Sequence, residues 1–338
     1  MTLGELWFAV IAVLWTGFFV LEGFDFGVGI LQGVLAAGEP ERRAAINTIG
    51  PLWDGNEVWL VVAAAGMFAA FPGWYATMFS ALNLVLVVLL AALIGRGLSF
   101  EFRGKAAAAR WRRGWTWLMT AGSVAAPLLL GLALGDLLHG LPVDSRQEYT
   151  GSLADLLQPY AIYAGCTLAA LCVLHGATFL ALKTAGALQA RAGLLARRAA
   201  PPVAALAAGF AVWTHASAGK GVLPNVIEVA AVLAVIAAGW LSRAGRDGGA
   251  FAATTVAMAG PVASVFTELY PRVLVSSTSP AFSLTISNTA SGDYALRVMT
   301  IVVVIFLPVV LAYQAWTYYV FRRRVSTSDF RTEGREQE

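Results

Sequence analysis

The stretch that decides the fold reads Leu21-Glu22-Gly23-Phe24-Asp25-Phe26-Gly27-Val28-Gly29 and, after a short loop, Gly50-Pro51-Leu52-Trp53-Asp54-Gly55-Asn56-Glu57-Val58-Trp59. Both parts belong to long apolar runs, yet together they carry four carboxylic acids. Of the 338 residues, 58% are hydrophobic and only 13% are charged, whereas a soluble domain has about 25% charged residues. The composition predicts an all-α protein that crosses a membrane several times, and four acids inside it require an explanation.

Nine apolar runs are long enough to cross a bilayer, which takes roughly 17 to 25 residues. They lie at about 5–27, 49–71, 75–94, 115–138, 156–182, 200–219, 223–241, 250–270 and 297–320. We therefore expect a polytopic transmembrane domain over 1–321, with an irregular outer loop at 271–296, and a basic or mixed-charge tail over 322–338. Glycines four residues apart, such as Gly23 and Gly27, favour close helix packing.

The basic residues predict the orientation, because loops on the cytoplasmic side of a membrane are enriched in Lys and Arg. With nine crossings, only four of the 23 Lys and Arg residues fall on the outer side: Arg146, Lys220, Arg272 and Arg297. This distribution places the N-terminus outside and the C-terminus in the cytoplasm. The net charge is only +3 and the cations lie in loops, so nothing indicates nucleic-acid binding.

The four acids form two pairs. Glu22 and Asp25 are three residues apart, as are Asp54 and Glu57, so each pair is predicted to share a helical face. Topology places all four in the inner half of the membrane, where each charged carboxylate costs about 2.5–3.5 kcal/mol. They must therefore be protonated, hydrated or paired with loop cations, such as Arg42, Arg43 or Arg96. We expect a role in moving or holding protons. The competing interpretation is that the acids only bond to backbone and water.

Few residues could ligate a cofactor. His175 lies inside the run at 156–182, whereas the other two histidines lie near outer boundaries. His175 fits a packing residue as well as a proton relay or ligand, and a single candidate does not predict haem binding by this chain. Cys166 and Cys172 are six residues apart in one run and form neither a disulfide nor a metal pair. The sequence predicts no metal site, and the motifs of soluble enzymes are absent.

A series of motifs resembles subunit II of the cytochrome bd-type quinol oxidases. Beyond the opening stretch, the resemblance continues through Glu41-Arg42-Arg43, Phe68-Ala69-Ala70-Phe71-Pro72, Arg96-Gly97-Leu98-Ser99-Phe100-Glu101-Phe102-Arg103, His175-Gly176-Ala177, Lys183-Thr184, Ser276-Ser277-Thr278 and Ser283-Leu284-Thr285-Ile286. This ordered series spans nearly the whole chain. The outer loop departs from it, with Asn288-Thr289-Ala290-Ser291-Gly292 where the family usually has a denser serine run.

The resemblance implies a subunit of a complex in a bacterial cytoplasmic membrane that oxidises quinol and reduces oxygen to water without pumping protons. It implies that haem b, haem d and the quinol site belong to an obligate partner, subunit I, which has a similar nine-helix fold. Small accessory peptides and membrane lipids are further expected partners. No haem is expected on this chain itself.

The resemblance also ranks the residues. It implies that Asp25 and Asp54 take part in proton uptake from the cytoplasm, and that Trp59 lies near an apolar oxygen route. We add Glu57 and Glu22 as supporting groups, and Arg96 or Glu101 near the mouth of the path. Two alternatives stay open: a proton- or cation-coupled transporter that uses the same acids, and a purely structural assembly partner.

Overall fold

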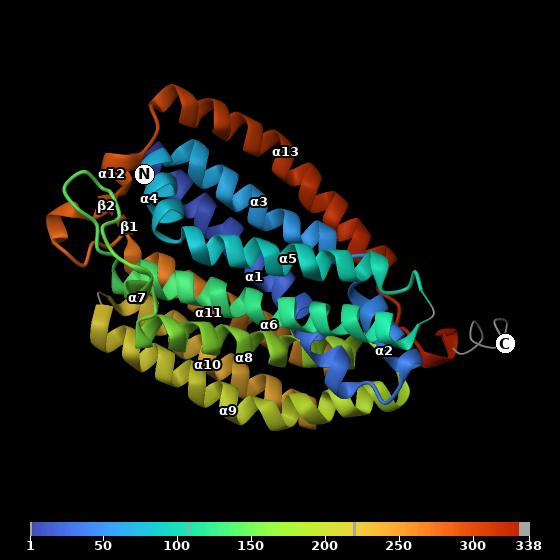
Figure 1. Cartoon of the computed structure of the whole chain (residues 1–338). Helices are drawn as coiled ribbons and strands as arrows, with labels where there is room; N and C mark the ends of the chain where they lie inside the picture. Colours follow the sequence, from blue (N-terminus) through green and yellow to red (C-terminus); the bar gives the residue numbers. More distant parts are fainter. Residues whose placement is uncertain (1, 107, 219–220, 331–338) are drawn as a thin grey trace.

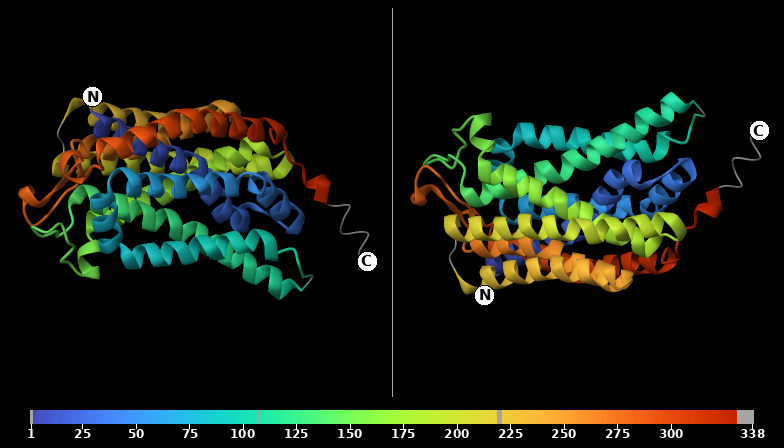
Figure 2. Two further views of the ribbon diagram at one scale, coloured as in Figure 1. Left: turned by 90° about the horizontal axis from the view of Figure 1, so that it is seen from above. Right: turned by 90° about the horizontal axis from the view of Figure 1, so that it is seen from below.

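The long helices of the chain lie side by side. The computed structural model describes residues 2–106, 108–218 and 221–330. Figures 1 and 2 show the long helices as one bundle with short segments gathered at its two ends. The helices are α1 Leu3–Leu35, α2 Glu39–Ile49, α3 Trp53–Ala70, α4 Pro72–Ala81, α5 Asn83–Phe102, α6 Ala109–His139, α7 Leu153–Leu156, α8 Pro159–Lys183, α9 Gly186–Ala218, α10 Val222–Arg243, α11 Asp247–Leu269, α12 Ile286–Thr289 and α13 Asp293–Val320.

Seven of the described helices are long and apolar enough to cross a membrane: α1, α5, α6, α8, α10, α11 and α13. The expected run at 49–71 contains α3, whereas the run at 200–219 matches only the second part of α9, which begins 14 residues earlier than predicted. Neither helix reaches that level of hydropathy: Asp54, Asn56 and Glu57 lower it in α3, and Pro201, Pro202 and His215 lower it in the apolar part of α9. By length and composition, seven described helices are candidate spans, and the count of nine stays a prediction.

Three predicted boundaries were wrong. The run at 75–94 is divided at Leu82 between α4 and α5, because hydropathy does not register a change in helix direction. Helix α5 then continues to Phe102, eight residues past the predicted end of the run at 94. The outer loop is partly ordered: β1 Arg272–Leu274 pairs antiparallel with β2 Leu284–Thr285, and 3-10 helix η1 Pro280–Phe282 lies between them.

The tail is also partly ordered. Residues 327–330 form 3-10 helix η2 Thr327–Phe330, which packs against α2. Val325 donates its backbone N–H to the carbonyl of Lys183 over 2.8 Å. Residues 331–338 of the predicted tail lie outside the described residues, as does Lys220.

Helix α1 occupies the centre of the bundle, since it packs against α3, α6, α8 and α11. All residues of α1 from Glu22 to Gly29 are buried, although Val13 and Val34 elsewhere on the helix are exposed. Its closest neighbour is α8: a Cβ built on Gly27 would lie 2.0 Å from the carbonyl oxygen of Cys172. The predicted packing role of Gly27 is confirmed, and the acids of α1 are held at the core.

Helix α13 is the outermost helix near α3 (Figure 1). Leu296 is its one buried residue. Near one end the Trp7 indole donates to the Leu296 carbonyl over 3.2 Å, and at the other Lys183 Nζ donates to the carbonyl of Phe321. The helix is therefore fastened at its ends and covers the start of α3 between them.

Candidate functional site

Three helices bring a buried ionic cluster together. Glu22 and Asp25 come from α1, Glu57 from α3 and Arg96 from α5. Arg96 Nη1 lies 2.6 Å from Glu22 Oε1 and 3.3 Å from Glu57 Oε2. Glu22, Asp25 and Arg96 are completely buried, and Glu57 is half-buried. We call these four residues the acid cluster.

Aromatic rings enclose the guanidinium of Arg96. Its carbon lies 4.9 Å from the centroid of the Phe26 ring and 5.5 Å from that of Phe100. Such cation–π contacts stabilise a desolvated cation by up to about 2 kcal/mol. They lower the cost of burying Arg96 without neutralising the charge of any acid.

The acid cluster has three carboxyl groups for one guanidinium. The Glu22 and Asp25 carboxyls lie within hydrogen-bonding reach of each other. Glu22 Oε2 and Asp25 Oδ1 are buried without a donor among the described residues, and Glu22 Oε1 has only the ion pair with Arg96. An uncompensated buried charge costs several kcal/mol, and a proton on either carboxyl would turn their contact into a hydrogen bond. The arrangement suits a site that holds a proton between Glu22 and Asp25.

A network of amides continues from the acid cluster toward α13. Asn56 Nδ2 donates to Asp25 Oδ2 over 2.7 Å, and Asn56 Oδ1 accepts from Gln314 Nε2 over 3.2 Å. The Tyr318 hydroxyl donates to the same oxygen over 2.9 Å. The Trp59 indole donates to Gln314 Oε1 over 2.8 Å. We call Asn56, Gln314, Tyr318 and Trp59 the amide network.

The amide network forms part of the wall of a cleft between α1, α3 and α13. The cleft has a volume of about 510 Å³. Most of its lining is apolar, including Val58, Val62, Val302 and Phe306, and Asp54 joins the amide network at its polar end. One cleft thus combines an exposed acid, a link to Asp25 and an apolar trough.

The predicted acids are only partly brought together. Glu22, Asp25 and Glu57 meet, but Asp54 is exposed on the cleft side of α3, and Glu101 is exposed near the end of α5. The predicted shared face holds for Glu22 and Asp25. Asp54 and Glu57 point to different surroundings, the cleft and Arg96 respectively.

The predicted positions of the cations need correction. Arg96 is not in a loop at a mouth but within α5 and fully buried, because the helix continues past the apolar run and Glu22 balances its charge. Arg42 bonds to Glu39 over 3.4 Å instead of to the acids. Arg43 lies over the Phe330 ring at 5.7 Å.

Glu39 forms an ion pair at the α2 end of the bundle. Its carboxylate accepts two hydrogen bonds of 2.8 Å from Arg103 Nη2. Burial alone would raise the pKa of Glu39, but the hydrogen bonds and charge of Arg103 outweigh burial, so the pKa falls below its usual value. Arg191 pairs similarly with Glu41. These pairs connect α2 to α5 and α9.

Sequence reasoning missed Asn56, Gln314 and Tyr318. Asn56 lies between Asp54 and Glu57 in the opening stretch. Its position two residues from Asp54 was the sequence feature that could have identified it as a site residue. Gln314 and Tyr318 lie four residues apart in an otherwise apolar helix, and such spacing puts both side chains on one face. Only the fold shows that this face meets Asn56.

His175 is buried and fully engaged. Its Nε2 lies 3.1 Å from the Val20 carbonyl oxygen and its Nδ1 lies 2.7 Å from the Thr254 hydroxyl. Because a carbonyl only accepts, Nε2 carries the proton. The ring also stacks on Phe251, with centroids 4.8 Å apart. His175 does not present a free nitrogen to an iron atom, so its position does not fit an axial haem ligand.

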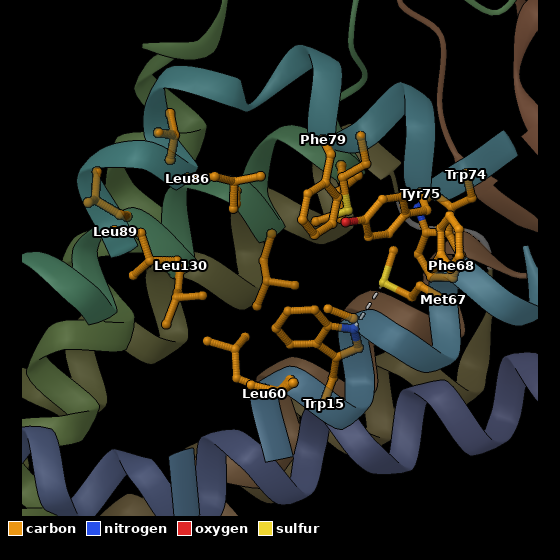
Figure 3. Close-up of a pocket in the computed structure, with 18 of the residues that line it drawn as sticks. Trp15, Leu60, Met67, Phe68, Trp74, Tyr75, Phe79, Leu86, Leu89 and Leu130 are labelled. Carbon is orange, nitrogen blue, oxygen red and sulfur yellow. Dashed lines mark hydrogen bonds between the residues drawn. The ribbon is translucent and has the colours of Figure 1, made fainter. Parts of the chain in front are cut away.

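Within the described ranges, no group of three or more His, Cys, Asp or Glu side chains is arranged to hold a metal ion. A further cavity, of about 390 Å³, lies between α1, α3, α4, α5 and α6. Figure 3 shows Trp15, Leu60, Tyr75 and Phe79 around it, with a bond of 3.3 Å from the Trp15 indole to Met67 Sδ. Its lining contains no acid or cation, so this cavity suits an apolar guest.

Comparison with known proteins gives consistent results. Residues 3–321 match the family model described as cytochrome bd terminal oxidase subunit II. Cytochrome bd ubiquinol oxidase subunit 2 of Bacillus subtilis is 43% identical over 329 residues, which cover 96% of this chain and 97% of the relative. Cytochrome bd-I ubiquinol oxidase subunit 2 of Escherichia coli K12 is 33% identical over 361 residues, covering 96% and 95%.

The fold has a solved counterpart in the bd oxidase of Geobacillus thermodenitrificans. The two chains superpose with a TM-score of 0.77 at 19% sequence identity, over 95% of this chain and 99% of the other. At this identity the likeness concerns the fold alone, and it supports the all-helical architecture with the short segments described above.

Proposed function

The chain belongs to the cytochrome bd terminal oxidase subunit II family, and from this premise we propose that it is the haem-free second subunit of a quinol:oxygen oxidoreductase that supplies protons from the cytoplasm. Membership of a membrane-bound respiratory terminal oxidase follows from the family. The proton role rests on one observation: the carboxyl groups of Glu22, Asp25 and Glu57, two of them completely buried and the third half-buried, lie in one cluster with the single guanidinium of Arg96.

The redox chemistry takes place in the partner, subunit I. Haem b and haem d of that subunit supply the electron transfer and the oxygen-reducing centre, and the quinol is oxidised there. The engaged nitrogens of His175 accord with a haem-free chain. The exposed apolar faces of α3 and α13, which include Val61, Phe68, Ile305 and Val309, suit contact with the partner subunit, with lipid or with small accessory peptides.

Protons enter at the α2 end of the bundle and stop first at Asp54, which is exposed. The amide network then stands between Asp54 and Asp25 in the same cleft wall. Asp25 and Glu22 hold the proton against the field of Arg96, and Glu57 is the half-buried third member. Arg96 thus acts as a fixed counter-charge inside the bundle and does not lie at the mouth of the proton path, whereas we keep Glu101 near that mouth. His175 has a packing role.

We assign nine crossings with the N-terminus outside, which gives this direction of uptake. Within the described ranges, nine helices of 18 residues or more run alternately between the two ends of the bundle, and Arg103, Arg191 and Arg243 lie at the α2 end. Assignment of that end to the cytoplasm places the acid cluster in the inner half of a bacterial inner membrane. Protons consumed from this side would separate charge without a pump.

Oxygen uses the apolar part of the same cleft. The apolar trough of the cleft reaches the Trp59 ring, which packs so closely on α1 that a Cβ on Gly17 would lie 2.6 Å from Trp59 Cζ3. Oxygen is small and apolar and favours such surfaces over water. We assign the entry of oxygen to this trough.

Neither alternative is favoured. A coupled transporter would use the same acids, but the family belongs to an oxidase. In a purely structural subunit, loss of an acid would affect assembly only. The test is Asp25→Asn in the purified complex, with haem content measured first and then oxygen consumption and alkalinisation inside proteoliposomes.

With full haem content, we expect oxygen consumption to fall at least about tenfold, which corresponds to a barrier about 1.4 kcal/mol higher. Asp293→Asn is the matched control, because Asp293 is exposed in the first turn of α13 at the opposite end. Unchanged turnover and alkalinisation in Asp25→Asn would refute the proton role. Loss of haem without loss of turnover per haem would favour the structural alternative.

A further inference from the structure

Three of the hydrogen bonds of the amide network form a chain with one direction. Trp59 donates to Gln314 over 2.8 Å, Gln314 donates to Asn56 over 3.2 Å, and Asn56 donates to Asp25 over 2.7 Å. Each link therefore directs a positive hydrogen toward the carboxylate of Asp25. A chain of bonds with one polarity strengthens cooperatively when its terminal acceptor is charged.

The amide of Asn56 cannot turn over without loss. Its Nδ2 has two acceptors, Asp25 Oδ2 and the Leu21 carbonyl at 3.4 Å. Its Oδ1 has two donors, Gln314 and Tyr318. A flipped amide would oppose oxygen to oxygen at Leu21 and NH₂ to NH₂ at Gln314. The orientation of Asn56, and with it the polarity of the whole chain of bonds, is fixed from both sides.

The end of this chain lies in the wall of the oxygen cleft. Trp59 and Gln314 both line the cleft, and Gln314 belongs to α13, the helix with one buried residue. Gln314 and Tyr318 bond to Trp59 and Asn56, and these bonds hold this part of α13 against α3. A change at Asp25 can thus reach the wall of the cleft.

We propose that Asn56 and Gln314 are positioning residues that transmit the protonation state of Asp25 to Trp59 and α13, so that the proton site and the oxygen cleft respond to each other. Protonation of Asp25 turns a charge-assisted bond into a neutral one, which is about half as strong. The two bonds behind it then weaken, and Trp59 and α13 loosen. Deprotonation tightens the wall again.

The groups that face Asp25 are few. Glu22 lies on its own helix, Arg96 on α5 and Glu57 on α3, while Asn56 and Tyr318 are the neutral neighbours. Among the described residues, Asn56 and Tyr318 are the groups that connect this set to the cleft. The proposal rests on the proposed function in one respect, since it takes Asp25 to be a group that gains and loses protons.

Infrared difference spectra of the intact complex, recorded against pH without turnover, test the coupling. The Asp25 carboxyl band is identified by its loss in Asp25→Asn, and the Trp59 indole N–H band by its loss in Trp59→Phe. In the wild type we expect the indole band to move to higher frequency over the same pH range in which Asp25 becomes protonated. In Asp25→Asn it should not move.

Gln314→Met removes both links of Gln314 at similar volume. We expect the Asp25 band still to respond to pH, while the Trp59 band takes the position of a free N–H and stays there. Thr317→Val is the control, because Thr317 lines the same cleft but bonds only to the Tyr313 carbonyl of its own helix, over 3.1 Å.

A Trp59 band that ignores pH in the wild type, or that follows pH equally in Gln314→Met, would overturn the coupling. The wild type and Asp25→Asn decide the matter even if Gln314→Met fails to assemble. Because these bands are read at rest, failure of proton uptake in the turnover assay leaves the result on coupling intact, and failure of coupling leaves the uptake result intact.

Discussion

Arg96 is the residue whose removal tests the electrostatics of the acid cluster most directly. Arg96→Met keeps the length and apolar body of the side chain and deletes the guanidinium. Glu22 and Glu57 then lose their bonds of 2.6 Å and 3.3 Å to Arg96, and Phe26 and Phe100 lose a cation. Breaking a buried ion pair from one side costs about 3–5 kcal/mol.

The expected change in the thermal midpoint follows from the loss of these contacts and from the ability of the acids to become protonated. About 4 kcal/mol, at roughly 2 °C per kcal/mol for a large chain, predicts a fall in the thermal midpoint of the complex on the order of 5 to 10 °C near neutral pH. The cost arises from carboxylates left charged, so acid should restore part of it. Arg96→Met combined with Glu22→Gln should also recover part of the midpoint, because one uncompensated charge disappears.

The assay is thermal unfolding of the detergent-solubilised complex at one scan rate, followed by intrinsic fluorescence, at several pH values. Arg322→Met is the control for loss of an arginine, since Arg322 is exposed and lies over the ring of Tyr319. If Arg96→Met melts like the wild type, or if Glu22→Gln lowers the double variant further, then Arg96 does not balance the buried acids and the electrostatic argument fails.

Two further predictions concern the surroundings of the site. Gly27→Val should strongly reduce the yield of assembled complex, because its Cβ alone would lie 2.0 Å from the Cys172 carbonyl oxygen. Gly193→Ala should not reduce the yield, because the space around Gly193 is open. The haem absorbance per milligram of membrane protein measures the yield of each variant. The ion pair of Glu39 should stabilise the wild type above the usual carboxyl pKa of 4.5, and this contribution should be lost as pH falls through the lowered pKa of the folded state. The thermal midpoint of Glu39→Gln should therefore change less with pH below about 5 than that of the wild type. Equal slopes of midpoint against pH in both proteins would contradict the role of Arg103.

The sequence was sufficient for what depends on local composition. Long apolar runs locate helices because backbone groups in lipid must bond within the segment, and the four acids stand out against that background. What depends on the meeting of distant segments was out of reach. Arg96 was assigned to a loop because hydropathy counts its charge and not the partner that cancels it.

The same limit explains the missed amides. Asn56, Gln314 and Tyr318 have ordinary polarity for residues near a membrane interface, and their importance comes from a contact between α3 and α13 across more than 250 positions of sequence. Asp54 and Glu57 show the converse case. Their spacing predicts one shared face, but Asp54 lies in the cleft beside α13 and Glu57 lies beside Arg96 of α5.

The difference between Asp25 and Asp54 carries the functional argument furthest. Both acids stand out equally in the sequence, yet Asp25 is completely buried among Glu22, Arg96 and Asn56, while Asp54 is exposed in the cleft. An exposed acid exchanges protons directly with solvent, whereas a buried acid beside a second carboxyl can share one proton with it. A path that takes up protons at Asp54 and holds them at Asp25 needs both properties in this order. If the two environments were exchanged, the residue that holds the proton would be open to solvent. The amide network stands at the step between them, which is why its polarity, and not the number of acids, is the feature to test.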